Sequence, residues 1–370
     1  MKRSFIREIL EHTTNETISF AGGLPDESLF PMEDLKKSAI NIMNNNSNLQ
    51  YTKSTGIDSL KEKIAQFYCE DGFYTKAENI MITSGSQQAL DIISRYYKGK
   101  NISIESPSYL GAINVFNLNN IRQESITLEN DGINLNEFTL SIKKTKFTYL
   151  IPDFQNPTGK TYSSKKREKI ASIIKENDAI LIEDSPYSEL YFDTKNPMIS
   201  ASLANNSFHL GSFSKTLAPS LRIGWIRADK RLLEPLIPYK EAMDLHTNGL
   251  SQYILADYLN DTNKYKKHLD NLRIEYKVKM HLFKKYLDLY LPQFKYSTPK
   301  GGMFIYGKLS NIDTSLLLKE CMKDDVVFVP GVEFYNDDKI KDEIRFNFTR
   351  TSINEIKQGL SKIAEILKSF

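Results

Sequence analysis

The sequence predicts an α/β fold with two domains: a large one built on a mostly parallel, helix-covered β-sheet, and a smaller α+β domain at the C-terminus. From Asn79 onward, short apolar runs alternate with helical stretches, which is typical of parallel strands joined by helices. After about Leu250, long helical patterns take over and end in a mixed tail. The 370 residues suffice for two such domains. We expect an arm and a segment packing with the small domain at 1–45, the large domain at 46–248 and the small domain at 249–370.

Hydrophobic periodicity places the individual elements. Ile6, Ile9 and Leu10 recur at helical spacing and indicate a short amphipathic arm. The predicted helices cover residues 32–43, 56–68, a stretch ending near 97, 163–176, 253–259, 265–289 and 353–367. The predicted strands cover residues 80–83, 102–104, 147–151, 179–183, 208–210, 222–226, 303–306 and 344–348.

Composition and charge argue against several classes of protein. Lys and Arg number 49 against 46 Asp and Glu, so the net charge of +3 implies no nucleic-acid or membrane partner. Cys69 and Cys321 are isolated in the sequence, which argues against a disulfide framework or a metal site and favours two buried thiols. The charged N-terminus lacks the apolar core of a signal peptide, and no apolar run approaches membrane-spanning length. We therefore expect a soluble, cytoplasmic protein.

One lysine lies in a hydroxyl-rich loop between two apolar runs, in the stretch GSFSKTLAPSLRIGW at 211–225. Lys215 is placed to form a Schiff base with an aldehyde, which requires a partly desolvated, unprotonated amine. Ser212 and Arg222 offer a hydroxyl and a planar fork of donors, which suit a phosphate group. An aldehyde and a phosphate on one small molecule point to pyridoxal 5'-phosphate. The alternative is an exposed loop with an ordinary solvated lysine.

Polar clusters follow several predicted strands, at the sheet edge where ligands of α/β proteins bind. Ser86 and Gln87 come directly after a strand and begin a helix, where free N–H groups and the helix dipole bind anions. Tyr109 follows the next strand and can stack on a planar heterocycle. The alternatives are a simple helix N-cap for Ser86 and an ordinary packed side chain for Tyr109.

Two further strand ends carry Asn156 and Asp184. Asn156 precedes a proline, which favours an extended backbone, and its amide can donate to a phenolate oxygen. A buried Asp184 must be protonated or paired with a cation, and a protonated pyridine nitrogen is such a cation. Tyr187 can donate to the ring oxygen. The alternatives are an ordinary Asn-Pro turn and a capping aspartate.

Near the C-terminus, Arg345 lies between apolar neighbours in a predicted strand. An arginine in such a place needs an anionic partner, and a carboxylate that accepts two N–H bonds suits its planar fork. Arg345 is therefore a candidate for binding a carboxylate. The alternative is a structural ion pair.

In this order, the clusters resemble those of fold-type I PLP-dependent aminotransferases of class I and II. The chain is most similar to the branch with 2-aminoadipate and kynurenine aminotransferases and the aminotransferase-like half of MocR-type regulators. The matching stretches are FAGGLP at 20–25, LQY at 49–51, GSQQ at 85–88, PDFQNPTG at 152–159, EDSPY at 183–187, GSFSK at 211–215, LRIGW at 221–225 and IRFNF at 344–348. They extend from the arm to the last strand, so the resemblance covers nearly the whole chain.

The resemblance implies a fold-type I large domain with a mostly parallel seven-stranded sheet, and it implies a role for each matching residue. Lys215 would be the Schiff-base lysine and the proton shuttle. Asp184 would pair with the pyridine nitrogen, while Asn156 and Tyr187 would contact the ring oxygen. Tyr109 would stack on the ring. Lys215, Asp184 and Tyr187 are thus the expected catalytic residues.

The resemblance also implies how phosphate and substrate are bound. The residues expected to hold the phosphate are Ser86, Gln87, Ser212 and Arg222. Tyr51 matches a tyrosine that reaches the phosphate of the neighbouring subunit in this family, which implies a homodimer with shared active sites. Arg345 would bind the substrate α-carboxylate, with Asn156 and Gly23 lining the same pocket. Arg7 on the arm is a candidate for binding a distal carboxylate of glutamate or 2-aminoadipate, and a solvated helix charge is its alternative.

The implied activity is transfer of an amino group from an L-amino acid to a 2-oxo acid by a ping-pong mechanism, with 2-oxoglutarate as the expected acceptor. Aromatic and branched-chain amino acids remain open as donors. Three alternatives share these site residues: a lyase acting on Cβ–S bonds, a non-catalytic sensor of PLP or amino acids, and a soluble α/β protein with a vestigial site. MocR-type regulators carry a DNA-binding domain ahead of this region, whereas this chain begins at the arm. That difference disfavours the regulatory alternative.

Overall fold

The computed structural model describes residues 5–11, 13–14, 16–203, 205–337 and 339–370. Its α-helices are α1 (Phe5–Glu11), α2 (Met32–Met43), α3 (Asp58–Glu70), α4 (Ser86–Tyr96), α5 (Leu110–Leu118), α6 (Leu135–Thr145), α7 (Ser164–Glu176), α8 (Ile199–Leu203), α9 (Lys230–Leu233), α10 (Ile237–Asp244), α11 (Gly249–Tyr258), α12 (Thr262–Tyr290), α13 (Thr314–Lys323) and α14 (Ile353–Leu367). Its strands are β1 (Ile18–Ser19), β2 (Ile80–Thr83), β3 (Asn101–Ser106), β4 (Arg122–Glu129), β5 (Gly132–Ile133), β6 (Phe147–Leu150), β7 (Ile180–Asp184), β8 (Ser207–Ser212), β9 (Gly224–Arg227), β10 (Lys295–Tyr296), β11 (Phe304–Lys308), β12 (Val326–Val327), β13 (Val329–Pro330) and β14 (Glu343–Asn347).

The large sheet has the strand order β2-β9-β8-β7-β6-β3-β4-β5. Strands β8, β7, β6, β3 and β4 run parallel, whereas β9 is antiparallel to both β2 and β8. This confirms the mostly parallel sheet. The expected number of seven strands is corrected to eight, because the two-residue β5 pairs antiparallel with β4. So short a strand leaves no period-two pattern in the sequence.

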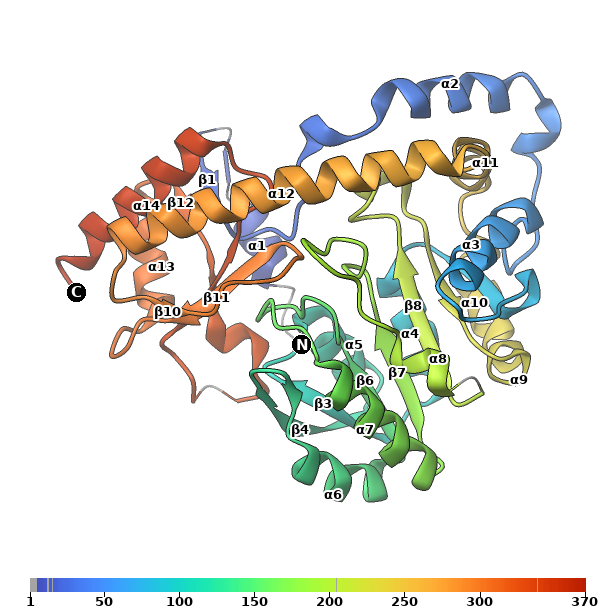
Figure 1. The fold of residues 1–370 in the computed structure, drawn as a ribbon, viewed down its shortest axis with the longest axis horizontal. Helices are drawn as coiled ribbons and strands as arrows, with labels where there is room; N and C mark the ends of the chain where they lie inside the picture. The colour runs from blue at the N-terminus through green and yellow to red at the C-terminus, as the bar shows by residue number, and fades with distance from the viewer. Residues whose placement is uncertain (1–4, 12, 15, 204, 338) are drawn as a thin grey trace.

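Helices cover both faces of this sheet because its inner strands are apolar on both sides (Figure 1). Successive residues of a strand point to opposite faces. Tyr149 and Ile182 accordingly lie in the core under α4 and α5, whereas Leu150 and Leu181 lie in the core under α6, α7 and α8. All four side chains are fully buried. The strands are thus enclosed on both faces, and their carboxyl ends are where a ligand can approach.

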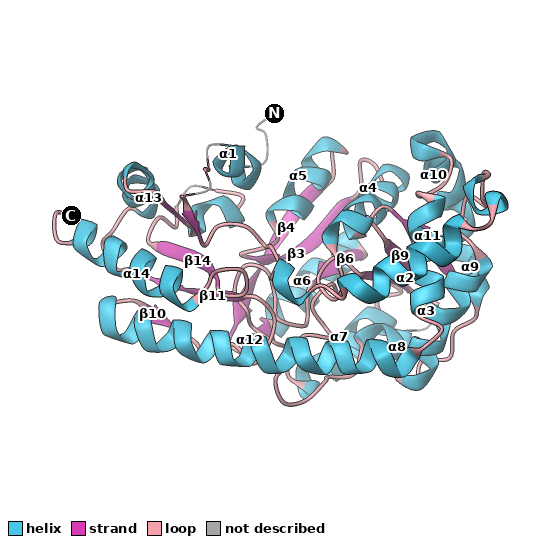
Figure 2. Ribbon diagram, turned by 90° about the horizontal axis from the view of Figure 1, so that it is seen from above, coloured by secondary structure: helices cyan, strands magenta, loops and turns pink. Residues whose placement is uncertain are grey.

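The small domain is built on a second sheet with the strand order β10-β11-β14-β13, antiparallel throughout. Helix α14 packs against α12 and α13. Helix α12 runs along much of the molecule, from α11 beside the large domain to the small domain (Figures 1 and 2). Helix α11 packs against α2 and α3. Strand β1 pairs in parallel with β12 and so attaches the N-terminal segment to the tail. The division at 1–45, 46–248 and 249–370 stays a prediction.

Most elements lie where periodicity places them, and α2, β2 and α14 have the predicted bounds. The elements that have no predicted counterpart are the helices α5, α6, α8, α9, α10 and α13 and the strands β1, β4, β5, β10, β12 and β13. Helix α5 buries five of its nine residues and carries apolar side chains on nearly every side, so its sequence LGAINVFNL shows no clear helical period. Strand β4 is largely polar and exposed at its start, because only the short β5 lies beyond it. Tertiary contacts with the large sheet therefore decide both elements: α5 packs on its face, and β4 pairs with β3.

The expectation that both cysteines are buried is wrong for Cys69. Cys321 is buried in α13, whereas Cys69 is exposed near the end of α3. Cys69 directly follows the buried Tyr68, and one step along a helix turns a side chain by about 100° toward solvent here. Its sulfur still lies 3.4 Å from the backbone nitrogen of Thr75.

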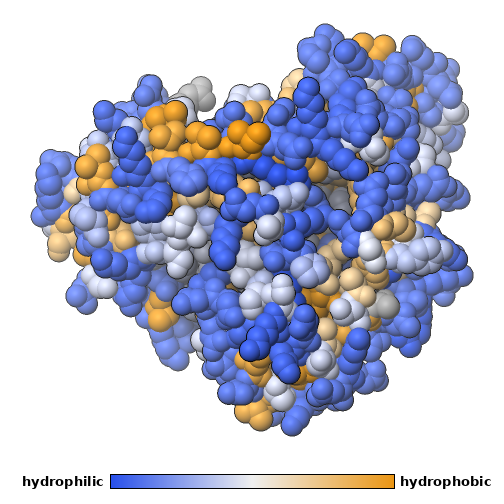
Figure 3. All heavy atoms as spheres, viewed as in Figure 1, coloured by the Kyte–Doolittle hydropathy of each residue, from blue (hydrophilic) through white to orange (hydrophobic). Residues whose placement is uncertain are grey.

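The molecular face in Figure 3 is mostly hydrophilic, with an apolar band over the middle of α12. Three large apolar side chains of α12 reach solvent: Ile274 with 60% of its surface exposed, Val278 with 50% and Leu289 with 62%. Across the described parts of the chain, no helix combines the length and apolar character needed to span a membrane.

Candidate active site

A cavity of about 730 Å³ opens at the carboxyl ends of β6, β7 and β8, beside the first turn of α4. Because parallel strands end at the same edge of the sheet, side chains far apart in the sequence meet here. The small domain contributes through β14, and the N-terminal segment contributes through Gly23. The sequence-predicted residues that line this cavity are Gly23, Ser86, Gln87, Tyr109, Asn156, Asp184, Tyr187, Ser212, Lys215, Arg222 and Arg345.

Lys215 lies in the turn that follows β8. Its Nζ donates to the carbonyl oxygen of Gly23 at 2.6 Å. A Cβ atom on Gly23 would lie 4.0 Å from this Nζ and 3.3 Å from the ring of Phe304. A side chain at position 23 would therefore crowd the space beside the amine. The absence of one leaves room for a ligand next to Lys215.

An anion-binding cradle lies at the start of α4. Gly85 precedes the helix with a φ of +85°, a conformation that L-residues rarely adopt. A Cβ atom there would meet Nη2 of Arg222 at 2.7 Å, so glycine lets the guanidinium approach the turn. A Cβ atom on Gly224 would meet the backbone nitrogen of Ser86 at 2.8 Å. Strand β9 therefore packs closely against the first turn of α4, whose free N–H groups and dipole favour an anion.

Hydrogen bonds hold the cationic side of this cradle in place. Nη2 of Arg222 donates to the carbonyl oxygen of Ser84 at 2.7 Å, and Nη1 donates to that of Pro219 at 3.3 Å. The backbone nitrogen of Ser214 donates to Oγ of Ser212 at 3.1 Å. The hydroxyls of Ser86 and Ser212, the guanidinium of Arg222 and the N-terminus of α4 together form the donor set that a phosphate monoester requires.

Asp184 ends β7 and is 3% exposed. Its Oδ2 accepts a hydrogen bond of 2.7 Å from the hydroxyl of Tyr149, a residue that sequence reasoning missed. Its Oδ1 is buried and has no hydrogen-bond partner among the described residues. Burial raises the pKa of Asp184 to about 6. A buried carboxylate with one open oxygen is suited to a cationic N–H donor.

The raised pKa predicts a pH-dependent effect of Asp184→Asn on stability. Above about pH 6 the cofactor-free wild type must bury a charge, whereas below about pH 4 the carboxyl is neutral in both folded and unfolded states. We expect cofactor-free Asp184→Asn to be more stable than cofactor-free wild type by up to roughly 3 kcal/mol above about pH 6, and equally stable below about pH 4. Chemical denaturation across this pH range measures the difference.

Glu62→Gln is the control for this prediction, because Glu62 is an exposed carboxylate on α3. It should change stability little at any pH. If the stability difference between Asp184→Asn and wild type did not vary with pH, the assignment of a buried carboxyl with a raised pKa would be wrong.

Asn156 and Tyr187 meet where the ring oxygen of a cofactor is expected. Nδ2 of Asn156 lies 3.4 Å from the hydroxyl of Tyr187. Burial raises the pKa of Tyr187, so its hydroxyl keeps its proton and can donate. Tyr109 lies across the cavity, and its hydroxyl donates to Oε1 of Gln87 at 3.0 Å. This bond links the aromatic ring of Tyr109 to the first turn of α4.

Arg345 is 1% exposed and lies in the middle of β14. Its Nη1 donates to Oδ1 of Asn156 at 2.8 Å, and its Nη2 donates to the carbonyl oxygen of Ala21. The guanidinium lies 4.4 Å from the ring centre of Phe304. Burial lowers its pKa to about 10, so it stays charged near neutral pH. Among the described residues, no carboxylate lies within ion-pair distance of Arg345. The alternative of a structural ion pair is therefore not supported by the described part of the chain.

One predicted site residue, Tyr51, is not among the described residues that line this cavity. Tyr51 is 77% exposed, and its ring meets that of His246 edge-on at 5.7 Å. An exposed Tyr51 is available to a second subunit, but its proposed contact stays a prediction. Arg7 lies in α1, and its side chain is outside the described part of the chain.

Sequence reasoning also missed Glu105, which is fully buried at the end of β3. It accepts hydrogen bonds from the hydroxyl of Tyr162 at 2.6 Å and from Nε2 of Gln155 at 3.1 Å, and burial raises its pKa to about 7. Nε2 of Gln155 also donates to the carbonyl oxygen of Pro107 at 2.9 Å. This network ties together the turns that carry Tyr109 and Asn156. The signal that would have identified it is a glutamate directly after Ile104, at the end of a predicted buried strand.

The arrangement fits pyridoxal phosphate in three respects. The open Oδ1 of Asp184 is an acceptor for a pyridinium N–H. The cradle at α4 supplies donors for a phosphate, and the Lys215 amine lies in the same cavity for an aldehyde. Arg345 adds a separate place for a carboxylate. These groups would hold the cofactor and orient a substrate beside it.

Comparison with known proteins gives the same assignment. The model of the family "Aminotransferase class I and II" matches residues 17–363. Aromatic-amino-acid aminotransferase 1 of Thermococcus litoralis is 35% identical, and the alignment covers 100% of this chain and 92% of that protein. The kynurenine aminotransferase of Pyrococcus horikoshii, solved in complex with PMP, has a TM-score of 0.92 at 34% identity over 100% of this chain and 95% of that one.

A third relative is LysN, the α-aminoadipate aminotransferase of Thermus thermophilus, solved with N-(5'-phosphopyridoxyl)-L-leucine. It has a TM-score of 0.92 at 31% identity and covers 100% of this chain and 95% of its own. These matches extend over the full set of residues that build the cavity. The chain therefore belongs to the class I and II aminotransferases and is a PLP-dependent aminotransferase.

Proposed function

We propose that this enzyme moves the amino group of an L-amino acid to a 2-oxo acid in two successive half-reactions, with 2-oxoglutarate as the common acceptor. The observation that supports this order is that the described lining of the cavity contains one fully buried arginine, Arg345, and one lysine, Lys215. Both substrates must then use the same place in turn. In the first half-reaction the amino acid leaves its amino group behind and departs as a 2-oxo acid, with water supplying the oxygen. The second half-reaction reverses these steps.

Each residue has a separate task in this proposal. When bound, pyridoxal phosphate withdraws electrons from the substrate Cα and makes its proton acidic. Lys215 takes that proton as a general base and then donates it to the cofactor as a general acid. Asp184 keeps the pyridine nitrogen protonated, and Tyr187 donates to the ring oxygen. Arg345 binds the α-carboxylate and thereby orients the Cα–H bond.

The remaining cavity residues position the cofactor. Asn156 reaches both the ring oxygen and Arg345, which its 2.8 Å bond to that arginine supports. Tyr109 stacks on the ring. The phosphate is bound by Ser86, Gln87, Ser212 and Arg222, with Gly23 lining the substrate side.

We further propose a homodimer in which Tyr51 reaches the partner's phosphate. Its 77% exposure and its position outside the cavity of its own chain support this contact. A cytoplasmic location is proposed from the two cysteines, which are both free thiols.

For the donor, we propose amino acids whose distal group is a carboxylate, as in glutamate and 2-aminoadipate, with Arg7 as its partner. The relatives named for aromatic amino acids, kynurenine and α-aminoadipate leave aromatic donors as the alternative. Arg7→Ala should raise the KM for both acidic donors and leave that for phenylalanine unchanged. The exposed Arg231 on α9 provides the control, as Arg231→Ala. Equal KM values for glutamate and 2-aminoadipate before and after Arg7→Ala would refute this role.

A half-reaction screen tests the proposed function. The PLP-loaded enzyme is mixed with single amino acids, and the absorption of the bound cofactor is followed together with 2-oxo acid release. Conversion of the cofactor to its aminated form, reversed by 2-oxoglutarate, is expected. A spectral shift without conversion would indicate a sensor. Pyruvate release from cysteine conjugates without an oxo-acid acceptor would indicate a Cβ–S lyase.

A further inference from the structure

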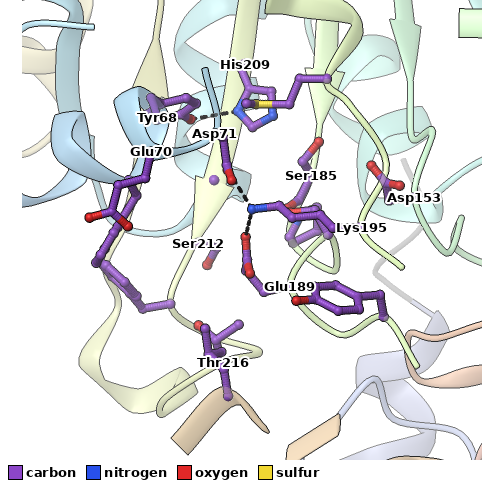
Figure 4. A pocket seen from close by; sticks show the side chains of 18 of the residues that line it. Tyr68, Glu70, Asp71, Asp153, Ser185, Glu189, Lys195, His209, Ser212 and Thr216 are labelled. Carbon is purple, nitrogen blue, oxygen red and sulfur yellow. Dashed lines mark hydrogen bonds and ion pairs between the residues drawn. The ribbon is translucent and has the colours of Figure 1, made fainter. Parts of the chain in front are cut away.

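A second cavity, of about 340 Å³, lies on the other side of β8 from the active site, between the end of α3 and α12 (Figure 4). Among the described residues, its lining shares only Pro186 and Ser212 with that of the active-site cavity. Thr216, which follows Lys215, faces this second space. The segment 212–216 therefore forms a thin wall between the two cavities. A volume above about 300 Å³ is typical of small-molecule sites.

Aromatic side chains make up much of its lining. They are Phe67, Tyr68, Tyr191, Phe213, Trp225 and Tyr265. The rings of Phe213 and Trp225 lie 4.9 Å apart, and those of Phe67 and Tyr265 lie 5.5 Å apart. Such a wall favours a planar aromatic ligand through stacking and edge-to-face contacts.

One buried hydrogen-bond donor of the lining has no acceptor. Nε1 of Trp225 can only donate, and it does so to the hydroxyl oxygen of Tyr68 at 2.8 Å. The Tyr68 hydroxyl lies 2.7 Å from Nδ1 of His209, and we assign its proton to this bond because Nδ1 is the acceptor beside it. Burial lowers the pKa of His209 to about 3, so the ring is neutral and its one proton is on Nε2. His209 is 5% exposed, and this Nε2 has no partner among the described residues.

A second buried polar group on the lining also lacks a hydrogen-bond partner among the described residues. Ser185, which directly follows β7, is 5% exposed, and its Oγ has no hydrogen-bond partner among the described residues. Figure 4 shows Ser185 and His209 on the same side of the cavity. Buried donors without an acceptor destabilise the folded state, and a ligand with an acceptor atom would satisfy them.

The charged residues of the lining are already paired, so they do not call for an ionic ligand. Nζ of Lys195 lies 2.5 Å from carboxylate oxygens of both Asp71 and Glu189 (Figure 4). Arg273 binds Glu189 at 3.0 Å and Asp270 at 2.8 Å. The two other carboxylates of the lining are paired as well, Glu70 with Lys266 at 3.0 Å and Asp153 with Arg167 at 2.6 Å. The lining groups that remain without a hydrogen-bond partner, Nε2 of His209 and Oγ of Ser185, are therefore neutral.

We propose that this cavity is a second binding site, for a small neutral aromatic molecule that carries a carbonyl-type hydrogen-bond acceptor. The ring packs against the aromatic wall, and the acceptor atom meets Nε2–H of His209 and the hydroxyl of Ser185. The ligand lies against the face of the segment 212–216 opposite to Lys215. This site is additional to the proposed transamination and does not depend on which amino acid the enzyme uses.

Trp225 is the only tryptophan of the chain and lines the cavity, so its fluorescence reports on occupancy. We would titrate the holoenzyme with benzamide, and with cyclohexanecarboxamide as the non-aromatic probe of equal acceptor. Equilibrium dialysis of labelled benzamide counts the sites per chain. We expect a saturable change in Trp225 emission with benzamide, one site per chain, and weaker binding of cyclohexanecarboxamide.

Variants locate the site. His209→Leu removes the donor and should raise the Kd for benzamide roughly five- to tenfold, whereas His209→Gln keeps an N–H donor and should bind nearly as wild type. Asn196→Phe places a bulky ring on the lining and should abolish binding. His281→Leu, on an exposed position of α12, is the matched control. Arg345→Lys tests for binding in the active site instead.

Several results would overturn the proposal. They are the absence of saturable binding by both readouts, binding that survives Asn196→Phe, equal affinity for the two carboxamides, and loss of binding in Arg345→Lys. Far-ultraviolet circular dichroism verifies that each variant is folded. Because Asn196 lies in a half-buried loop, its variant keeps the test decisive if the His209 variants fail to fold.

Discussion

Lys215→Ala is expected to lower kcat by a factor on the order of 100,000, because the proposed Schiff-base amine and the proposed proton shuttle are lost together. The Lys215 amine lies 2.6 Å from the Gly23 carbonyl inside the cavity, and the described cavity lining contains no second lysine that could replace it. The measurement is steady-state transamination combined with borohydride reduction and peptide mass spectrometry. Wild type should retain reduced cofactor on the peptide that contains Lys215, and the variant should retain none.

A purely structural role for Lys215 would give a different pattern. Methylamine, a small primary amine, should restore part of the proton-transfer rate in Lys215→Ala, which a misfolded protein would not show. Lys230→Ala is the control, since Lys230 is exposed on α9 and pairs only at 3.5 Å with Glu234. Near-normal turnover by Lys215→Ala would rule out the mechanism.

Arg345→Lys is expected to lower kcat/KM for amino acids roughly 100- to 1000-fold, because a point charge replaces a planar fork of donors in a fully buried place. In the structure the fork is used on both sides: Nη1 bonds Asn156 at 2.8 Å, and Nη2 bonds the carbonyl of Ala21. An ammonium cannot make both bonds and also bind a carboxylate side-on. The measurement is stopped-flow kinetics of single half-reactions with several amino acids.

An amine without a carboxylate separates binding from chemistry in this variant. With benzylamine, which has no group for Arg345 to bind, wild type and Arg345→Lys should react at similar slow rates. Arg231→Lys, at an exposed position of α9, should behave as wild type with every substrate. A large loss of benzylamine turnover would show that Arg345 acts on the cofactor or the fold instead of the substrate carboxylate.

The fold shows where local sequence patterns suffice and where they fail. Strand β2 and helices α2 and α14 each have one polar and one apolar face or a short apolar run, so their bounds follow from periodicity. Helix α5 has apolar residues on nearly all sides and β5 has only two residues, so neither carries a readable period. Cys69 shows the same limit, because burial at the end of a helix depends on what lies beside it.

The sequence by itself determined which residue types follow each strand, and parallel topology then required them to share one edge. That is why the order of residues along the chain is enough to assign Lys215, Asp184 and Asn156 to a common site. Tertiary packing alone decided what these groups touch: the Tyr149 bond to Asp184, the Asn156 bond to Arg345, and the bond from Lys215 to the carbonyl oxygen of Gly23. The physical reason is one of range. Periodicity records which face a residue turns inward, whereas hydrogen-bond partners and burial are set by segments that are distant along the chain.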